Sequence, residues 1–224
     1  MAKITFLNLA ETKKQALLDA CFEEFALNNY DKASITHIVK KLGIAKGSIY
    51  QYFENKKDLY FYLIDYGTEL RFQNVKELFQ SRSLTFKDLL IENFLEKVKF
   101  DNKYPIVGAF LFTVMNERFA DDLGNMEVII KERIVQLTRD LLQKYIRTNH
   151  IRNDLQIDVM AYLVVQVQIG LYDFLEMKYN IDFRKNIKEK KPLITLKENH
   201  LKNIIEQFAE ILLCGIKNKS NDKC

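Results

Sequence analysis

The chain has 224 residues and a net charge of +4, and its 48% hydrophobic and 29% charged residues are an ordinary globular composition. Its seven glycines and two prolines are few for this length, which favours long helices and argues against a sandwich, a barrel or a glycine-rich nucleotide-binding enzyme. The three cysteines are far apart and form no CxxC pair, so neither a disulfide scaffold nor a structural zinc site is expected.

Apolar residues recur with the 3.6-residue period of an α-helix along most of the chain. The predicted helices span residues 12–28, 34–42, 45–53, 56–81, 85–100, 105–118, 126–149, 155–179 and 196–217. No segment alternates apolar and polar residues for long enough to predict a strand. The expected fold class is therefore all-α, with about nine helices.

Residues that favour helix ends stand at several of these boundaries. Thr12, Ser34 and Asn55 suit the N-caps of the first, second and fourth predicted helices. Asn28-Asn29 is expected to end the first helix in the left-handed conformation, and Gly43 to end the second. The second and third predicted helices are consequently short, and a glycine-containing turn separates them.

Charge is unevenly distributed along the N-terminal third of the chain. Residues 1–31 hold three lysines against five acidic residues, whereas residues 32–57 hold six lysines against one glutamate. The basic block indicates a surface that faces phosphates, although a solvated lysine-rich face would have the same charge. A second basic run, residues 184–191, is expected to be a solvated loop.

The basic block contains a candidate DNA-binding motif. Two short helices joined through Gly43 form a helix-turn-helix, whose second helix enters the major groove in DNA-binding proteins. On this second helix, Ile49 and Phe53 are expected to face inward. The opposite face presents Lys46, Gly47, Tyr50 and Gln51.

The outward-facing residues have side chains that suit DNA. Lys46 can donate to guanine or to a phosphate, and Gln51 can pair with adenine. The Tyr50 hydroxyl can reach a phosphate, and Gly47 lets the backbone approach the duplex closely. Lys56, at the start of the next helix, can hold a phosphate together with backbone N–H groups. The alternative is a three-helix packing unit with scattered polar residues.

The stretch from Ala33 to Leu59, with the core GIAKGSIYQYF followed by NKKDL, resembles the DNA-binding signature of the TetR family of bacterial transcriptional regulators. The resemblance covers about residues 12–62 and implies a sequence-specific regulator of a double-stranded DNA operator. It implies DNA contacts from Ser34, Thr36, Lys46, Gly47, Ser48, Tyr50, Gln51, Tyr52 and Lys56. Asn29 stands where the family usually has glycine, and asparagine can adopt the same left-handed conformation.

The resemblance also implies two domains. Residues 1–62 would form the helix-turn-helix domain and residues 63–224 a helical regulatory and dimerisation domain, linked by the long helix 56–81. The strongly apolar helices 155–179 and 196–217 would pair across the twofold axis of a homodimer. The implied interface residues are Ile157, Ala161, Val164, Gln168, Leu171, Leu201, Ile205, Phe208 and Leu212. The alternative is that both helices form the core of a monomer.

Aromatic residues are dense between residues 72 and 119, as they are in apolar ligand sites and equally in helical cores. The candidate ligand-binding residues are Phe72, Phe94, Phe110, Met115 and Tyr172. The predicted ligand is a small, largely apolar or aromatic molecule that releases a repressor from a palindromic operator. A DNA-binding dimer regulated by a protein partner, or by no ligand, is the alternative.

An all-α enzyme is not expected, because the chain has no Glu-x-x-His pair and its three histidines lack metal-ligand spacing. No metal or other cofactor is therefore predicted. The most apolar segment, residues 159–172, is too short and too polar to span a bilayer, and the N-terminal residues lack a signal-peptide pattern. The sequence predicts a cytoplasmic protein.

Overall fold

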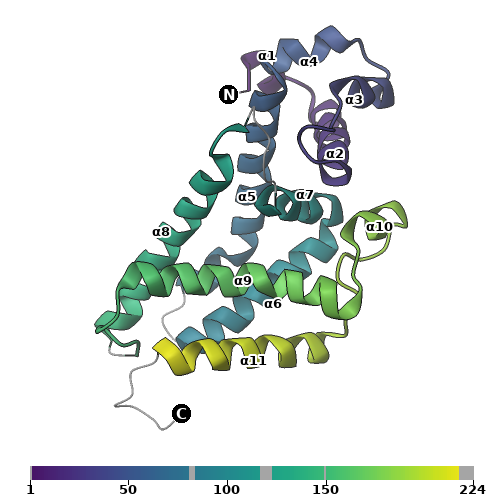
Figure 1. Ribbon diagram of the computed structural model, residues 1–224. Coiled ribbons are helices and arrows are strands. Elements are labelled where there is room, and N and C mark those ends of the chain that lie inside the picture. The colour runs from purple at the N-terminus through teal and green to yellow at the C-terminus, as the bar shows by residue number, and fades with distance from the viewer. Residues whose placement is uncertain (1, 81–83, 117–122, 149, 217–224) are drawn as a thin grey trace. The chain divides into compact units, whose positions relative to one another are not determined.

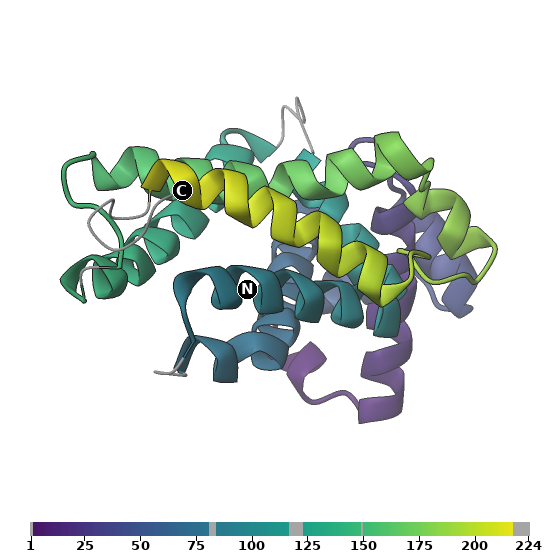
Figure 2. The ribbon, with the colours of Figure 1, turned by 90° about the horizontal axis from the view of Figure 1, so that it is seen from below.

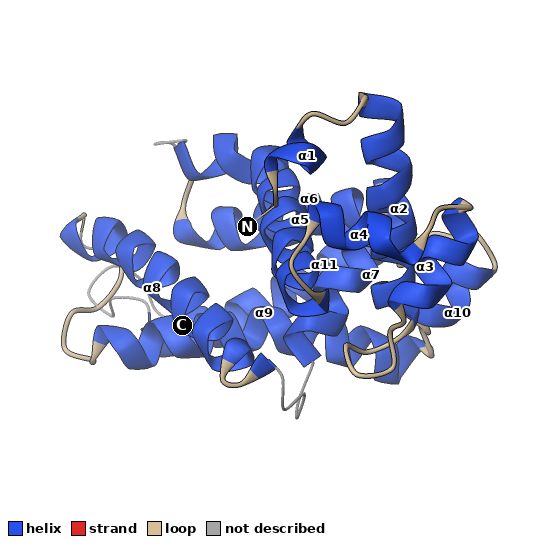
Figure 3. Ribbon diagram, turned by 90° about the horizontal axis from the view of Figure 1, so that it is seen from above, coloured by secondary structure: helices blue, strands red, loops and turns tan. Residues whose placement is uncertain are grey.

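The computed structural model describes residues 2–80, 84–116, 123–148 and 150–216, and within these ranges its regular elements are all α-helices (Figure 3). The eleven helices described are α1 (Ile4–Leu7), α2 (Glu11–Leu27), α3 (Ile35–Leu42), α4 (Lys46–Tyr52), α5 (Lys56–Gln80), α6 (Phe86–Lys103), α7 (Pro105–Asn116), α8 (Met126–Arg147), α9 (Ile157–Tyr179), α10 (Phe183–Lys188) and α11 (Glu198–Ile216). The predicted all-α fold is confirmed, and each of the nine predicted helices is present.

Two helices were not predicted. Helix α1 has four residues and α10 has six, which is too short for a helical period to show in the sequence. The prediction of a loop for the whole of residues 184–191 was wrong, because α10 occupies the first part of this basic run.

Three of the predicted helix ends are confirmed. At the start of α3 the Ser34 hydroxyl accepts a hydrogen bond from the His37 N–H at 3.4 Å. At the start of α5 the Asn55 side-chain oxygen accepts from the Asp58 N–H at 2.8 Å. Gly43 follows α3 with a φ of 66°, the left-handed conformation that glycine adopts without strain.

Helix α2 ends at Asn28 as predicted, but the predicted Thr12 cap and the predicted left-handed conformation at Asn28-Asn29 were wrong. The helix begins at Glu11, so Thr12 lies inside its first turn and does not cap it. It ends at Asn28, whose φ of −127° is extended, and Asn29 is not among the described residues with positive φ. The Asn28 side-chain amide donates to the Glu24 carbonyl at 3.2 Å, which satisfies the helix end without a left-handed residue.

The chain divides into two compact units, each with its own core. The first unit consists of Met1–Gln73, Phe100–Glu127 and Phe183–Leu193. Its core is aromatic, and α7 packs against α2 within it. Phe110 on α7 is fully buried, with its ring centroid 5.2 Å from that of Phe22 on α2 and 5.4 Å from that of Tyr60 on α5.

An ion pair is buried in the same unit. Asp101, which is 2% exposed, accepts a hydrogen bond from the Arg71 guanidinium on α5. The guanidinium carbon of Arg71 also lies 5.5 Å from the centroid of the Phe100 ring. A Cβ on Gly108 would lie 2.7 Å from the Asp101 side chain and 3.0 Å from its backbone, so α7 requires glycine there.

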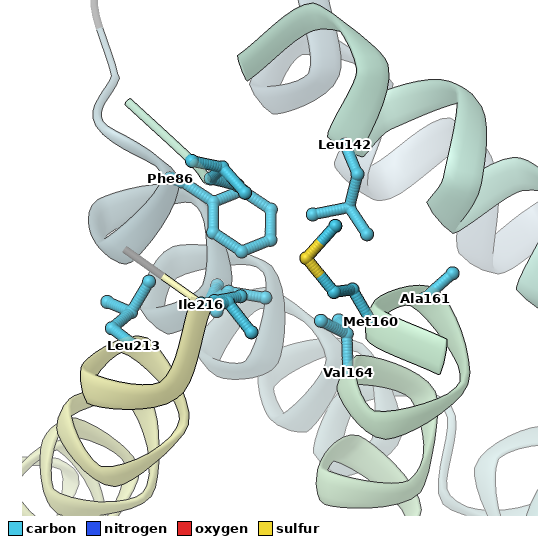
Figure 4. Packing of buried hydrophobic residues seen from close by; sticks show 9 residues of the cluster. Phe86, Leu142, Met160, Ala161, Val164, Leu213 and Ile216 are labelled. Atoms are coloured by element: carbon cyan, nitrogen blue, oxygen red, sulfur yellow. The ribbon is translucent and has the colours of Figure 1, made fainter. Parts of the chain in front are cut away.

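The second unit consists of Asn74–Lys99, Val128–Asp182 and Ile194–Cys224. Helices α9 and α11 lie side by side and antiparallel (Figures 1 and 2). Near one end of the pair the Tyr179 hydroxyl lies 2.8 Å from His200 Nε2, and near the other the Arg152 N–H donates to the Ile216 carbonyl at 3.0 Å. Residues of α6, α8, α9 and α11 share a buried apolar cluster (Figure 4), which includes Phe86, Leu142, Met160, Ala161, Val164, Leu213 and Ile216.

Helix α9 has an apolar surface that its own chain leaves largely uncovered. Among the described helices, it alone is long and apolar enough to pass a length-and-composition test for a membrane span, although core helices of soluble proteins pass the same test. The prediction that no segment spans a bilayer was based on residues 159–172 alone, whereas the helix that contains them has 23 residues. Only 28% of the most apolar 18-residue stretch of α9 is buried within the chain.

Candidate nucleic-acid interface

Helices α3 and α4 are held in place by the side chains on their inner faces. Ile38 on α3 is 1% exposed, and Ile49 on α4 and Phe53 after it are fully buried. The start of α3 is tied to α2, because the Ser34 N–H donates to Glu24 Oε1 at 2.9 Å. The inner face predicted for the second helix of the motif is therefore confirmed.

The opposite face of α4 is open to solvent. Its exposed residues are Lys46, Gly47, Tyr50 and Gln51, and Thr36 on α3 is exposed as well. A Cβ on Gly47 would meet no atom within 4 Å, so the fold of the chain does not itself require glycine at this position. A residue without a side chain leaves room for the backbone to approach an external partner.

The other predicted DNA contacts, Ser34, Ser48, Tyr52 and Lys56, are half-buried. Lys56 Nζ lies 4.5 Å from the centroid of the Tyr30 ring and donates to the Asp31 carbonyl at 3.4 Å. These contacts hold the ammonium group at the first residue of α5, where the helix presents unbonded N–H groups and the positive end of its dipole. The arrangement is suited to an anion such as a phosphate.

Sequence reasoning missed the N-terminal segment Lys3–Phe6, which contacts the end of α4 (Figure 1). The Phe6 ring centroid lies 6.1 Å from that of Tyr52, and the Lys3 N–H donates to the Tyr52 carbonyl at 2.9 Å. Sequence offered little signal for this contact, because its polar bonds go to backbone carbonyls that no side-chain pattern encodes.

Lysines dominate the charge of the helix-turn-helix. Lys40 and Lys46 are exposed, whereas Lys41 forms an ion pair with Glu23 on α2. A surface with exposed ammonium groups attracts a polyanion, and the attraction weakens as salt rises.

The described part of the chain shows no cluster suited to metal or thiol chemistry. It contains no group of three or more His, Cys, Asp and Glu side chains arranged to hold a metal ion. Burial raises the pKa of the Cys21 thiol far above its usual range, with the nearby Glu24 carboxylate adding to the rise. Cys21 therefore remains a neutral thiol in the core of the first unit.

The predicted dimer residues divide by burial. Buried against their own chain are Ala161, Val164, Leu171, Leu201 and Ile205, and half-buried are Ile157, Gln168, Phe208 and Leu212. The apolar side chains exposed on the same two helices are Val159, Tyr162, Leu163 and Met177 on α9 and Ile211 on α11. These exposed apolar residues were not singled out from the sequence, and the predicted interface residues stay a prediction.

The predicted ligand residues fall in different parts of the fold. In the second unit, the ring centroid of Phe94, which is 1% exposed, lies 5.1 Å from that of Tyr172. In the first unit, Phe110 belongs to the aromatic core, Met115 is half-buried, and Phe72 is 48% exposed. The structure therefore brings Phe94 and Tyr172 together.

Comparison with known proteins agrees with this geometry. Residues 17–63 match the family described as bacterial regulatory proteins, tetR family. A fatty acid metabolism regulator protein of Bacillus subtilis is 26% identical over 59% of this chain, a match that spans only 58% of that relative's length. The icaADBC biofilm operon negative transcriptional regulator IcaR of Staphylococcus epidermidis is 24% identical over 89% of this chain and 98% of its own. A TetR family transcriptional regulator from Chloroflexus aurantiacus, known from a crystal structure, is 27% identical with a TM-score of 0.71, covering 98% of this chain and 100% of that one.

A chain whose described elements are all helices, and whose N-terminal unit carries a helix-turn-helix with an exposed polar face, is a DNA-binding transcriptional regulator by class. Within that class, residues 17–63 match the TetR family of bacterial regulators, the family that the helix-turn-helix sequence resembles. The relatives named above are described as regulators and not as enzymes.

Proposed function

We propose that this chain is a transcriptional repressor that binds a palindromic operator as a homodimer and is released from it by a small ligand. The exposed face of α4 carries the proposal, because Lys46 and Gln51 project from a helix whose inner residue Ile49 is fully buried. A helix fixed in this way can hold hydrogen-bonding side chains in the major groove. One relative is a negative transcriptional regulator by name, which supports repression.

The residues divide into base-reading and backbone-holding groups in this proposal. Lys46, Ser48 and Gln51 face the bases, and Gly47 lets α4 approach them closely. Phosphates are held by Ser34, Thr36, Tyr50, Tyr52 and Lys56. Residues 1–62 form the DNA-binding domain and residues 63–224 the regulatory and dimerisation domain, and the protein acts in the cytoplasm.

The exposed apolar residues of α9 support a homodimer. Val159 and Leu163 are four residues apart on α9, Met177 lies fourteen residues further along the same side, and each is 45% exposed or more. Gly170 stands in the same row, where an added Cβ would meet nothing within 4 Å, so a partner helix can approach closely. Burial of these apolar side chains against a second copy of the chain would stabilise a dimer. A twofold dimer presents two recognition helices to a palindromic operator.

The second unit supports an apolar or aromatic ligand. Asn93 on α6 is 4% exposed, and its side-chain oxygen has no hydrogen-bond partner in the described part of the chain. It neighbours Phe94, whose ring contacts Tyr172. A buried acceptor without a partner and a pair of contacting aromatic rings in the same unit support a molecule with an apolar body and one donor. Regulation by a protein partner, or by no ligand, is the alternative.

Selection from a library of randomised DNA duplexes tests the proposal. The purified protein is expected to enrich duplexes with two inverted half-sites, whose centres lie one helical turn of DNA, about 34 Å, or a multiple of it apart. Enrichment of single half-sites would contradict the dimer, and no enrichment by the folded protein at low salt would contradict sequence-specific binding.

A further inference from the structure

The recognition helix α4 leaves the carbonyls of its last turn without partners inside the helix. It has seven residues, and the chain leaves it at Phe53 with an extended φ of −132°. The last four carbonyls of any α-helix lack partners within the helix. Here the Phe53 N–H reaches back to the Ile49 carbonyl at 2.9 Å, which leaves the carbonyls of Tyr50, Gln51 and Tyr52 to be satisfied from elsewhere.

The segment Lys3–Phe6 satisfies all three of these carbonyls. Lys3 Nζ donates to the Tyr50 carbonyl at 2.9 Å, and the Lys3 N–H donates to the Tyr52 carbonyl at 2.9 Å. The Thr5 hydroxyl donates to the Gln51 carbonyl. Three consecutive carbonyls at the end of α4 are thus capped by a segment more than 40 positions away in the sequence, with α1 lying beside α4 (Figure 3).

Phe6 anchors the segment in the core of the first unit. Its side chain is fully buried, and its ring centroid lies 5.0 Å from that of Phe53 and 5.2 Å from that of Tyr62 on α5. This packing fixes the position of the segment between the end of α4 and the long helix α5, and with it the donors that cap α4.

We propose that Lys3–Phe6 is a positioning clamp, which sets the rotation and pitch of α4 and thereby its DNA sequence specificity. The proposal rests on the DNA-binding function proposed above. The clamp grips the backbone of the same three residues, Tyr50, Gln51 and Tyr52, whose side chains are assigned to DNA. A short helix held at its end keeps these side chains at fixed positions relative to the groove. The Lys3 ammonium also offsets the negative end of the α4 dipole, which would otherwise repel phosphates.

Substitution of Thr5 tests the clamp in DNA binding. The probe is the duplex that the wild-type protein enriches most from a randomised library, compared with a random duplex of equal length. Loss of one hydrogen bond in Thr5→Val is expected to weaken binding of the selected duplex roughly three- to tenfold and to change random-duplex affinity by less than about twofold. Thr5→Ser, which keeps the hydroxyl, is expected to bind like the wild type. The matched control is Thr12→Val, at an exposed threonine on α2, which is expected to change neither affinity.

Backbone hydrogen exchange of the free protein tests the clamp without DNA. In Thr5→Val and Lys3→Met, amides of residues 49–53 are expected to exchange roughly three- to tenfold faster, while those of α3 and the central turns of α2 keep the wild-type rates. Unchanged exchange in residues 49–53 would overturn the clamp. Equal losses on the selected and random duplexes would also overturn it, because the segment would then add only general affinity. If the wild-type protein selects no duplex, the proposed function fails, and the exchange rates still decide whether the segment caps α4.

Discussion

Gln51 and Lys56 lie in different surroundings, and the difference predicts different effects on DNA binding. Gln51 projects from the exposed face of α4, where its amide has both a donor and an acceptor to offer to a base edge. Lys56 is half-buried and held by the Tyr30 ring and the Asp31 carbonyl at the start of α5. The first position is suited to reading bases and the second to holding a phosphate.

Gln51→Ala is expected to relax specificity at one base pair. Loss of a paired contact to a base edge should cost about 1–3 kcal/mol on the selected duplex and almost nothing on random DNA. Competition titrations with both duplexes measure the difference. Equal losses on the two duplexes would show that Gln51 does not read a base.

Lys56→Ala is expected to weaken binding to all sequences by a similar factor. Removal of one phosphate contact should lower the slope of log affinity against log salt by about 1. Titrations over a series of salt concentrations give the slope. Lys197→Ala removes the same charge from an exposed site just before α11 and should leave the slope unchanged. A wild-type slope in Lys56→Ala would exclude a phosphate contact.

At the scale of the helices, sequence predicted the inner and outer faces of α4 and most of the helix boundaries. The face of α4 was predictable because a period of 3.6 residues places Gln51 on the side of the helix opposite the buried Ile49. The clamp on α4 was not predictable, because it depends on long-range bonds to backbone carbonyls. The conformation at the end of α2 was mispredicted for a similar reason, since a side-chain bond from Asn28 replaces the expected left-handed turn.

The buried ion pair between α5 and the end of α6 gives a prediction about stability. Arg71→Met would leave the Asp101 carboxylate, 2% exposed, without its cation and should cost about 3–5 kcal/mol of unfolding free energy. Urea unfolding followed by circular dichroism measures this cost. The double variant Arg71→Met/Asp101→Leu is expected to recover part of the loss, because the buried carboxylate is removed together with its cation.

An exposed ion pair supplies the comparison for this stability prediction. Lys87 and Glu210 form a pair with side chains 41% and 58% exposed, and such pairs contribute about 0–1 kcal/mol. Lys87→Met should therefore have a much smaller effect than Arg71→Met. Similar losses in the two variants would show that burial does not set the importance of the Arg71 pair.

At the scale of the whole molecule, the proposed homodimer places α9 between two copies of the chain. Leu163→Glu places a charge in the exposed apolar row of α9 and is expected to convert a dimer to a monomer and to abolish tight operator binding. Leu137→Glu is the matched control, because Leu137 is 64% exposed on α8. Sedimentation equilibrium gives the mass, and a Leu163→Glu protein that stays dimeric would exclude this row from the interface.

The exposed face of α4 is proposed to read a particular DNA sequence. The most direct test is an equilibrium titration of the wild-type protein with its library-selected duplex, with a random duplex of equal length as competitor, at several salt concentrations. Both duplexes are expected to bind in a salt-sensitive way, with a preference for the selected one of about 10³-fold or more. Equal affinity for the two duplexes, or no binding by the folded protein at low salt, would rule out sequence-specific reading by α4.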